Sequence, residues 1–199
     1  MLQDLFISKT RVKLLEILLS DPTQIHHVRD LVRQTGEEIN AVRRELARME
    51  GLGMVKKEPR GNRLYYWFRH DYIYYFDLLS LVAKATGLGA NIIKNHNKIG
   101  QIRLAMLSGP FVRHEPRKIQ NEVELLIVGN LNLTELANVI RLEEAKRGVS
   151  INYTPMTDEE LKFRRSRRDP FLLDILTHTR VMIIGDEEDL VGAPVPAVQ

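Results

Sequence analysis

The sequence predicts an α+β protein with a helical N-terminal domain that ends in a β-hairpin and a C-terminal α/β domain. Two observations carry this prediction. Apolar residues recur at the helical period between residues 36 and 51, and two strand-like segments follow at once. Beyond residue 99, short apolar runs alternate with helix signals. We expect domains at 1–70 and 99–191, a connecting helix at 71–98 and a disordered tail at 192–199.

The first elements are two helices with a short strand between them. Ser8 or Thr10 can cap the first helix, and Asp21-Pro22-Thr23 ends it. We expect the strand at Ile25–His27 and the second helix at Val28–Gln34.

The third helix has two distinct faces. Its apolar stripe comprises Ile39, Val42, Leu46 and Met49. The opposite side carries Glu37, Asn40, Arg44 and Arg48, with Arg43 on its flank. Glu37 and Glu38 lie at the helix start, suit its dipole and are expected to cap it. One face is therefore available to the core and the other to a partner.

A cationic hairpin is expected directly after this helix. Its strands are Met54–Glu58 and Arg63–Phe68, separated by the turn-forming Pro59-Arg60-Gly61-Asn62. Residues 1–70 hold 13 Lys and Arg against 9 Asp and Glu, whereas residues 71–199 hold 16 against 17. The positive excess of the chain therefore lies in its first third, as it does in nucleic-acid-binding modules.

The order helix, strand, helix, turn, helix, hairpin resembles the winged helix-turn-helix domains of ArsR-like prokaryotic regulators over residues 4–70. The matching segments are Arg29-Asp30-Leu31-Val32, Val42-Arg43-Arg44-Glu45-Leu46 and Met49-Glu50-Gly51-Leu52-Gly53-Met54-Val55. The resemblance implies that the third helix enters the major groove of double-stranded DNA while the hairpin touches phosphates beside it.

The candidate DNA-binding residues fall into two chemical groups. Asn40 and Arg44 lie in the first turns of the third helix, where Asn can pair with adenine and Arg with guanine. Phosphate contacts are expected from Lys56, Lys57, Arg60 and Arg63. The whole set is Asn40, Arg43, Arg44, Arg48, Lys56, Lys57, Arg60, Asn62 and Arg63. The alternative is a solvated polar face that binds nothing.

Composition and spacing exclude several kinds of site. The chain has no cysteine, which removes disulfides, thiolate metal sites and cysteine nucleophiles. His26 and His27 point to opposite sides of a strand and cannot share one ion, so we expect no metal and no cofactor. Val12–Leu19 is too short and too charged to cross a bilayer and lacks a signal-peptide cleavage site, so no membrane partner and a cytoplasmic location are expected.

The connecting segment 71–98 carries an apolar stripe of Ile73, Phe76, Leu79 and Val82, and Gly87-Leu88-Gly89 interrupts the pattern. A helix this apolar either packs on its own domain or pairs with a second subunit. We expect a homodimer, because dimeric DNA readers bind two half-sites one helical turn apart.

The C-terminal domain alternates strand and helix signals. Strands are expected at Arg103–Ser108, Val123–Val128, Ser150–Thr154 and Arg180–Ile184, and helices at Leu133–Arg147 and after the capping segment Thr157-Asp158-Glu159-Glu160. The dense basic run 164–168 has several candidate partners: phosphate, DNA, or Asp186–Asp189 across a dimer. A solvated helix face is the remaining interpretation.

Two segments of this domain, Leu107-Ser108-Gly109-Pro110-Phe111 and residues 121–129, resemble the core of the minimal nucleotidyltransferase fold. The resemblance covers about residues 100–190 and implies a turn that cradles triphosphate and paired carboxylates that hold divalent metal. The vestiges of that site are Gly109, Glu122 and Glu124. Pro110 replaces the family's serine, the two glutamates replace aspartates, and no acid occurs between residues 150 and 157. We therefore expect no catalysis.

Together these features predict a DNA-binding transcriptional regulator. Its second domain would serve dimerisation, sensing of a small-molecule or nucleotide effector, or partner binding. Two alternatives stay open: an active nucleotidyltransferase that uses Glu122 and Glu124, and an antitoxin-like protein-interaction module.

Overall fold

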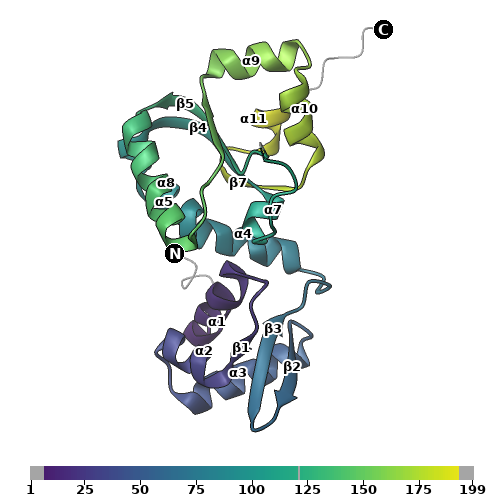
Figure 1. Cartoon of the computed structure of the whole chain (residues 1–199). Coiled ribbons are helices and arrows are strands. Elements are labelled where there is room, and N and C mark those ends of the chain that lie inside the picture. The colour runs from purple at the N-terminus through teal and green to yellow at the C-terminus, as the bar shows by residue number, and fades with distance from the viewer. Residues whose placement is uncertain (1–6, 121, 193–199) are drawn as a thin grey trace. The chain divides into compact units, whose positions relative to one another are not determined.

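A computed structural model describes residues 7–120 and 122–192 of the chain, which is a mixed α+β protein (Figure 1). The chain divides into two units. The N-terminal unit runs to Thr86 and includes Val112–Glu115, and the C-terminal unit comprises Gly87–Phe111 and the residues from Pro116 onward. The expected tail at 192–199 lies, apart from Gly192, outside the described residues.

The N-terminal unit consists of four helices and a small antiparallel sheet within its described part. Its elements are α1 (Lys9–Ser20), β1 (His26–His27), α2 (Val28–Thr35), α3 (Ile39–Gly51), β2 (Val55–Arg60), β3 (Arg63–Phe68) and α4 (Tyr75–Ala85). The sheet has the order β1-β3-β2, so the central strand is the last one in the chain. The order of elements expected for residues 8–68 is therefore confirmed.

Local chemistry explains where these helices begin and end. The Ser8 hydroxyl accepts a hydrogen bond from the Arg11 backbone N–H, which caps α1 as expected. Gly36 ends α2 in the left-handed conformation at φ 65°, which a glycine adopts without steric cost. The core of the unit is then built from the apolar faces of these helices, including Leu15 and Leu18 of α1 and Val42, Leu46 and Met49 of α3.

The hairpin is longer and its turn is tighter than the sequence suggested. The strand expected at Met54–Glu58 extends to Arg60, and Gly61-Asn62 alone forms the turn, with Gly61 at φ 57°. Pro59 is therefore part of β2, where it pairs with Leu64. A proline is tolerated there because β2 is an edge strand, which leaves one side of its backbone without a partner strand.

The range 71–98, expected to form one connecting helix, contains three separate helices. They are α4, α5 (Gly87–Lys94) and α6 (His96–Ile99). Thr86 is extended and Gly87 has φ 55°, so the helical hydrogen-bond ladder is broken between α4 and α5. The division between the two units falls at this break, and α4 packs on α1 within the N-terminal unit.

The C-terminal unit contains a four-stranded mixed sheet. Besides α5 and α6, its elements are β4 (Gly100–Ser108), α7 (Gly109–Val112), β5 (Leu125–Leu131), α8 (Leu133–Arg147), β6 (Tyr153–Met156), α9 (Asp158–Ser166), α10 (Pro170–Thr177), β7 (Arg180–Ile184) and α11 (Glu187–Val191). The strand order in the sheet is β6-β5-β4-β7. β4 is antiparallel to both β5 and β7, whereas β5 and β6 are parallel and joined by α8. The strand expected at Ser150–Thr154 begins three residues later, at Tyr153, and the strand expected at Arg180–Ile184 has those bounds.

Helices cover both faces of this sheet. On one face, Leu104, Met106, Leu126, Val128 and Met156 pack against Leu161, Leu172, Ile175 and Leu190 of α9, α10 and α11. Residues such as Leu125 and Ile127 alternate to the opposite face, on which α5 and α8 lie (Figure 1). Among the described residues, no single helix is long and apolar enough to span a membrane, and α4 and α5 reach that length and hydropathy only when counted together.

Candidate nucleic-acid interface

The helix α3 presents a row of polar and cationic side chains to solvent. Asn40, Arg43, Arg44 and Arg48 are all exposed, while Val42, Leu46 and Met49 on the other side are fully buried. The two faces predicted from the helical period are therefore confirmed. Ile39, the first residue of the predicted stripe, is only half-buried because it lies at the helix end.

Only one of the two glutamates that precede α3 caps the helix. The Glu38 carboxylate accepts hydrogen bonds from the backbone N–H groups of Asn40 (2.8 Å) and Ala41 (3.2 Å) and so caps the helix. Glu37, expected to share this role, instead accepts a hydrogen bond from Lys13 Nζ at 2.6 Å. Lys13 also donates to the Thr35 carbonyl at 2.8 Å, so α1 holds the turn that precedes α3.

A buried carboxylate that the sequence analysis missed ties α3 to α1. Glu45 is only 3 % exposed and accepts hydrogen bonds from Arg11 Nε and, at 3.2 Å, from the Ser8 hydroxyl. Arg48 approaches the same carboxylate at 3.5 Å. The helical phase of Glu45, between Val42 and Met49, is the signal that places it on the buried side.

All five hairpin residues predicted to bind DNA are exposed: Lys56, Lys57, Arg60, Asn62 and Arg63. Two of its cations are held by carboxylates of the same unit. Lys57 Nζ donates to Glu50 at 2.8 Å, and this hydrogen bond raises the pKa of the Lys57 ammonium. Arg60 donates to both Glu58 oxygens at 3.1 Å and lies over the Tyr65 ring at 5.3 Å. The hydrogen bond to Arg60 lowers the pKa of Glu58.

Most of the remaining cations of this surface lack carboxylate partners. Within residues 7–120 and 122–192, Arg43, Arg44, Lys56 and Arg63 form no ion pair, and Arg48 reaches only the buried Glu45. Glu50, the partner of Lys57, is half-buried, and Glu58, the partner of Arg60, is exposed. Unpaired cations attract polyanions more strongly than neutralised ones do, so α3 and the hairpin form a surface suited to a phosphate backbone.

The histidine pair lies beside this surface without forming a metal site. His26 is buried, with its Nδ1 3.7 Å from an Asp30 oxygen, and His27 packs against the Tyr65 ring at 5.5 Å. Burial lowers the pKa of His26, and Asp30 opposes that shift. In the part of the chain that the structure describes, no three His, Cys, Asp or Glu side chains converge as a metal site would require.

Gly109, Glu122 and Glu124, which the sequence predicts to be remnants of a nucleotide site, each form hydrogen bonds within the described residues. Gly109 begins α7, and its N–H donates to the Thr179 carbonyl at 2.7 Å. Glu122 accepts a hydrogen bond from the Lys118 N–H at 3.1 Å. β5 begins at Leu125, so both glutamates precede the strand on which the sequence analysis expected them.

Glu124 is the most constrained of these residues. It is buried, and Arg117 donates to both of its oxygens at 2.8 Å. The Asn152 backbone N–H donates to it as well, at 2.9 Å. The hydrogen bonds to Glu124 raise the pKa of Arg117. Because a bidentate guanidinium neutralises this carboxylate, a divalent ion would have to displace Arg117 before Glu124 could act as its ligand.

The basic run 164–168 is largely engaged within its own unit. Arg164 pairs with Glu160 (2.8 Å) and Asp169 (3.0 Å), and Arg165 donates to the Asp189 carbonyl at 3.4 Å. Arg167 lies over the Phe163 ring at 4.7 Å. The acidic segment 186–189, a candidate partner across a dimer, is thus contacted by Arg165 of the same chain.

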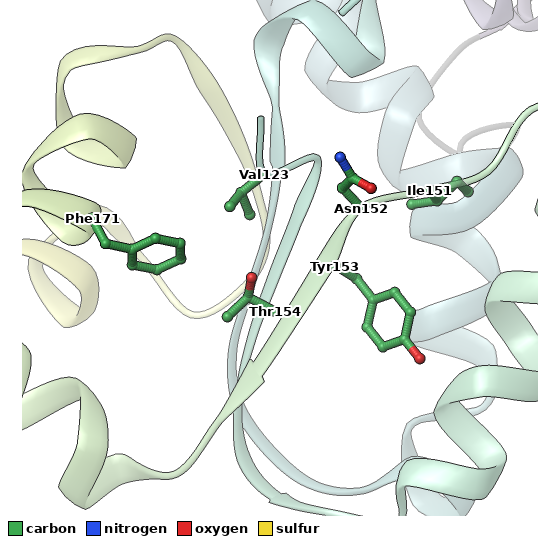
Figure 2. Close-up of a pocket in the computed structure, with 6 residues that line it drawn as sticks. All are labelled: Val123, Ile151, Asn152, Tyr153, Thr154 and Phe171. Atoms are coloured by element: carbon green, nitrogen blue, oxygen red, sulfur yellow. The ribbon is translucent and has the colours of Figure 1, made fainter. Parts of the chain in front are cut away.

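A shallow pocket of about 430 Å³ opens beside β6 in the C-terminal unit. Its lining residues are Val123, Ile151, Asn152, Tyr153, Thr154 and Phe171, and Figure 2 shows that Tyr153 and Thr154 point to opposite sides of the strand. The Asn152 amide donates to the carbonyls of Gln120 (2.7 Å) and Glu122 (3.3 Å). This amide therefore holds the segment before β5, and Gly109, Glu122 and Glu124 are not part of the lining.

Comparison with known proteins adds no assignment. No protein-family model, no curated protein and no solved structure was found to match the chain. The interpretation of the surface formed by α3 and the hairpin therefore depends on the residues of that surface alone.

Proposed function

We propose that the chain is a sequence-specific regulator of transcription that binds double-stranded DNA, and that its N-terminal unit is a winged helix-turn-helix domain. In this proposal α2 and α3 form the helix-turn-helix, and the β2–β3 hairpin is the wing. One observation carries the proposal: an exposed row of Asn40, Arg43, Arg44 and Arg48 on α3, followed by an exposed cationic hairpin. This combination matches what a major-groove helix with a phosphate-binding wing requires.

The two groups of residues have different roles in this proposal. Asn40 and Arg44 project from the first half of α3 and read base edges, because an amide can pair with adenine and a guanidinium with guanine. Lys56, Lys57, Arg60 and Arg63 bind phosphates, which positions the protein without specifying sequence. Lys57 and Arg60 would exchange their carboxylate partners for phosphate oxygens, so their contribution is smaller than that of unpaired cations.

The regulator acts as a cytoplasmic homodimer in this proposal, since two copies of α3 can then bind two half-sites. The C-terminal unit is a nucleotidyltransferase-like domain without catalysis, used for dimerisation, effector sensing or partner binding. The bidentate Arg117–Glu124 pair supports the absence of transfer chemistry, because it neutralises a carboxylate that metal binding would require.

Selection from a pool of random duplexes at two salt concentrations tests the proposal. We expect a palindromic sequence to be enriched and its affinity to fall steeply as salt rises. The matched comparison is Arg44→Ala against Arg33→Ala, since Arg33 is an exposed arginine on α2 that already pairs with Asp30. Enrichment without a defined site, or equal losses in the two variants, would contradict sequence-specific reading by α3.

A further inference from the structure

The outer face of α4 combines exposed apolar residues with two charges of opposite sign. Tyr75, Leu79 and Val82 are buried on one side of the helix. Away from that side, Phe76 is 58 % exposed with the Arg113 guanidinium 6.0 Å from its ring centroid, Leu81 is 38 % exposed, and Ile73, just before the helix, is 81 % exposed. Large apolar side chains grouped at this level of exposure mark interaction surfaces more often than scattered single ones do.

The two charges of this face are Asp77 in the first turn and Lys84 in the last. Both are exposed, and neither forms an ion pair within the described residues of the chain. They are seven positions apart, which corresponds to about 10 Å along a helix and about 20° around it. They therefore lie on the same stripe, on either side of Ser80 and Leu81.

We infer that this face of α4 binds the same face of a second copy of the chain, with the two helices antiparallel. A two-fold axis beside Ser80 and Leu81 brings Asp77 of each copy opposite Lys84 of the other. The surface is thus complementary to itself in charge, and a foreign partner would need the same charge order by coincidence. Ser80 is small enough for two helix axes to approach to about 8–10 Å, while Phe76 and Leu81 flank the contact on its two sides.

This inference rests on the homodimer of the proposed function and does not depend on DNA binding. Its test is the dissociation constant of the dimer, measured by sedimentation equilibrium without DNA. Asp77→Lys and Lys84→Asp each replace two attractive pairs by two repulsive ones, so each is expected to weaken the dimer by roughly tenfold or more. The combined D77K/K84D variant restores the pairs in reverse order and is expected to return the constant to within about threefold of the original.

A surface charge on another helix provides the matched control. Lys9→Asp reverses an exposed charge at the start of α1 and is expected to leave the dissociation constant unchanged. A second experiment uses the absence of cysteine from the chain. Ser80→Cys introduces its only thiol beside the proposed axis, and mild oxidation is expected to link two chains covalently, whereas Lys9→Cys is not.

Three results would overturn the inference. The first is that the wild-type chain is monomeric at 100-fold the concentration used for DNA binding. The second is that a single charge reversal leaves the dissociation constant of the dimer unchanged. The third is that the double reversal has a dissociation constant as high as those of the single reversals. A failure of this kind leaves the DNA-binding proposal intact, because a monomer can still bind one half-site. Conversely, a dimer with these properties and no affinity for DNA would refute the proposed function alone.

Discussion

Replacement of Glu45 by Gln is the most direct test of how α3 is held in place. The substitution keeps the shape of the side chain and removes the charge that Arg11 and Ser8 contact. Hydrogen bonds to a charged group contribute about 1.5–3 kcal/mol each, and a stranded partner adds to the cost. Arg11 is not stranded, since 29 % of its side chain is exposed. We therefore expect the free energy of unfolding to fall by about 2 kcal/mol, at the lower end of this range.

The assay is urea unfolding followed by tryptophan fluorescence. The chain has a single tryptophan, Trp67 in β3, so the signal reports the N-terminal unit alone. With a slope of about 2 kcal/mol per M urea, the midpoint should fall by about 1 M in Glu45→Gln. An unchanged slope would show that stability, and not the extent of unfolding, has changed.

Glu50→Gln is the matched control for this experiment. Glu50 lies on the same helix and also binds a cation, but both partners of its pair with Lys57 are at least 32 % exposed. Exposed pairs contribute little, so the midpoint should move by less than about 0.3 M. If the two variants lose stability equally, the buried network around Glu45 does not anchor α3 more firmly than a surface pair does.

The remaining predictions concern binding and pH. Arg44→Ala should cost roughly 1–3 kcal/mol at the preferred site and relax specificity at one base pair, measured by competition between single-base variants of the duplex. Lys57→Ala and Arg60→Ala should weaken binding to all sequences alike and reduce the slope of log affinity against log salt by up to about 0.9 each; losses confined to one sequence would refute their assignment to phosphate. Burial lowers the pKa of His26, so below about pH 6.5 the unfolded chain takes up a proton that the folded chain refuses. Stability should therefore fall as pH drops from 7 toward 5, and the unfolding midpoint of His26→Gln should show a smaller drop.

The sequence predicted the order of elements over residues 8–68 well because the main features there have local causes. The Ser8 cap, the left-handed Gly36 and the two-faced α3 all depend on neighbouring residues only. The length of β2 could not be predicted in the same way, since a proline is allowed at Pro59 only because β2 is an edge strand, and strand order is a tertiary property.

The candidate sites divide along the same line. The exposure of Asn40 and Arg44 follows from helical phase, which the sequence contains. The partners of Glu124 could not be predicted from helical phase. Arg117 contacts Glu124 from the loop before β5, and Asn152 follows α8 in the sequence. Contacts between residues 7 and 28 positions apart depend on the folded arrangement, so the sequence alone could not show that Arg117 neutralises the Glu124 carboxylate.

The position of β2 at the edge of its sheet has a consequence for solubility. An unpaired strand edge is a template on which other chains can add strands, and proteins prevent this with lysines, other charges and prolines along the edge. β2 contains Lys56, Lys57, Pro59 and Arg60 within six residues. The side chains proposed to bind phosphate therefore also oppose edge-to-edge aggregation, so selection for DNA affinity and selection against aggregation would favour the same residues in this strand.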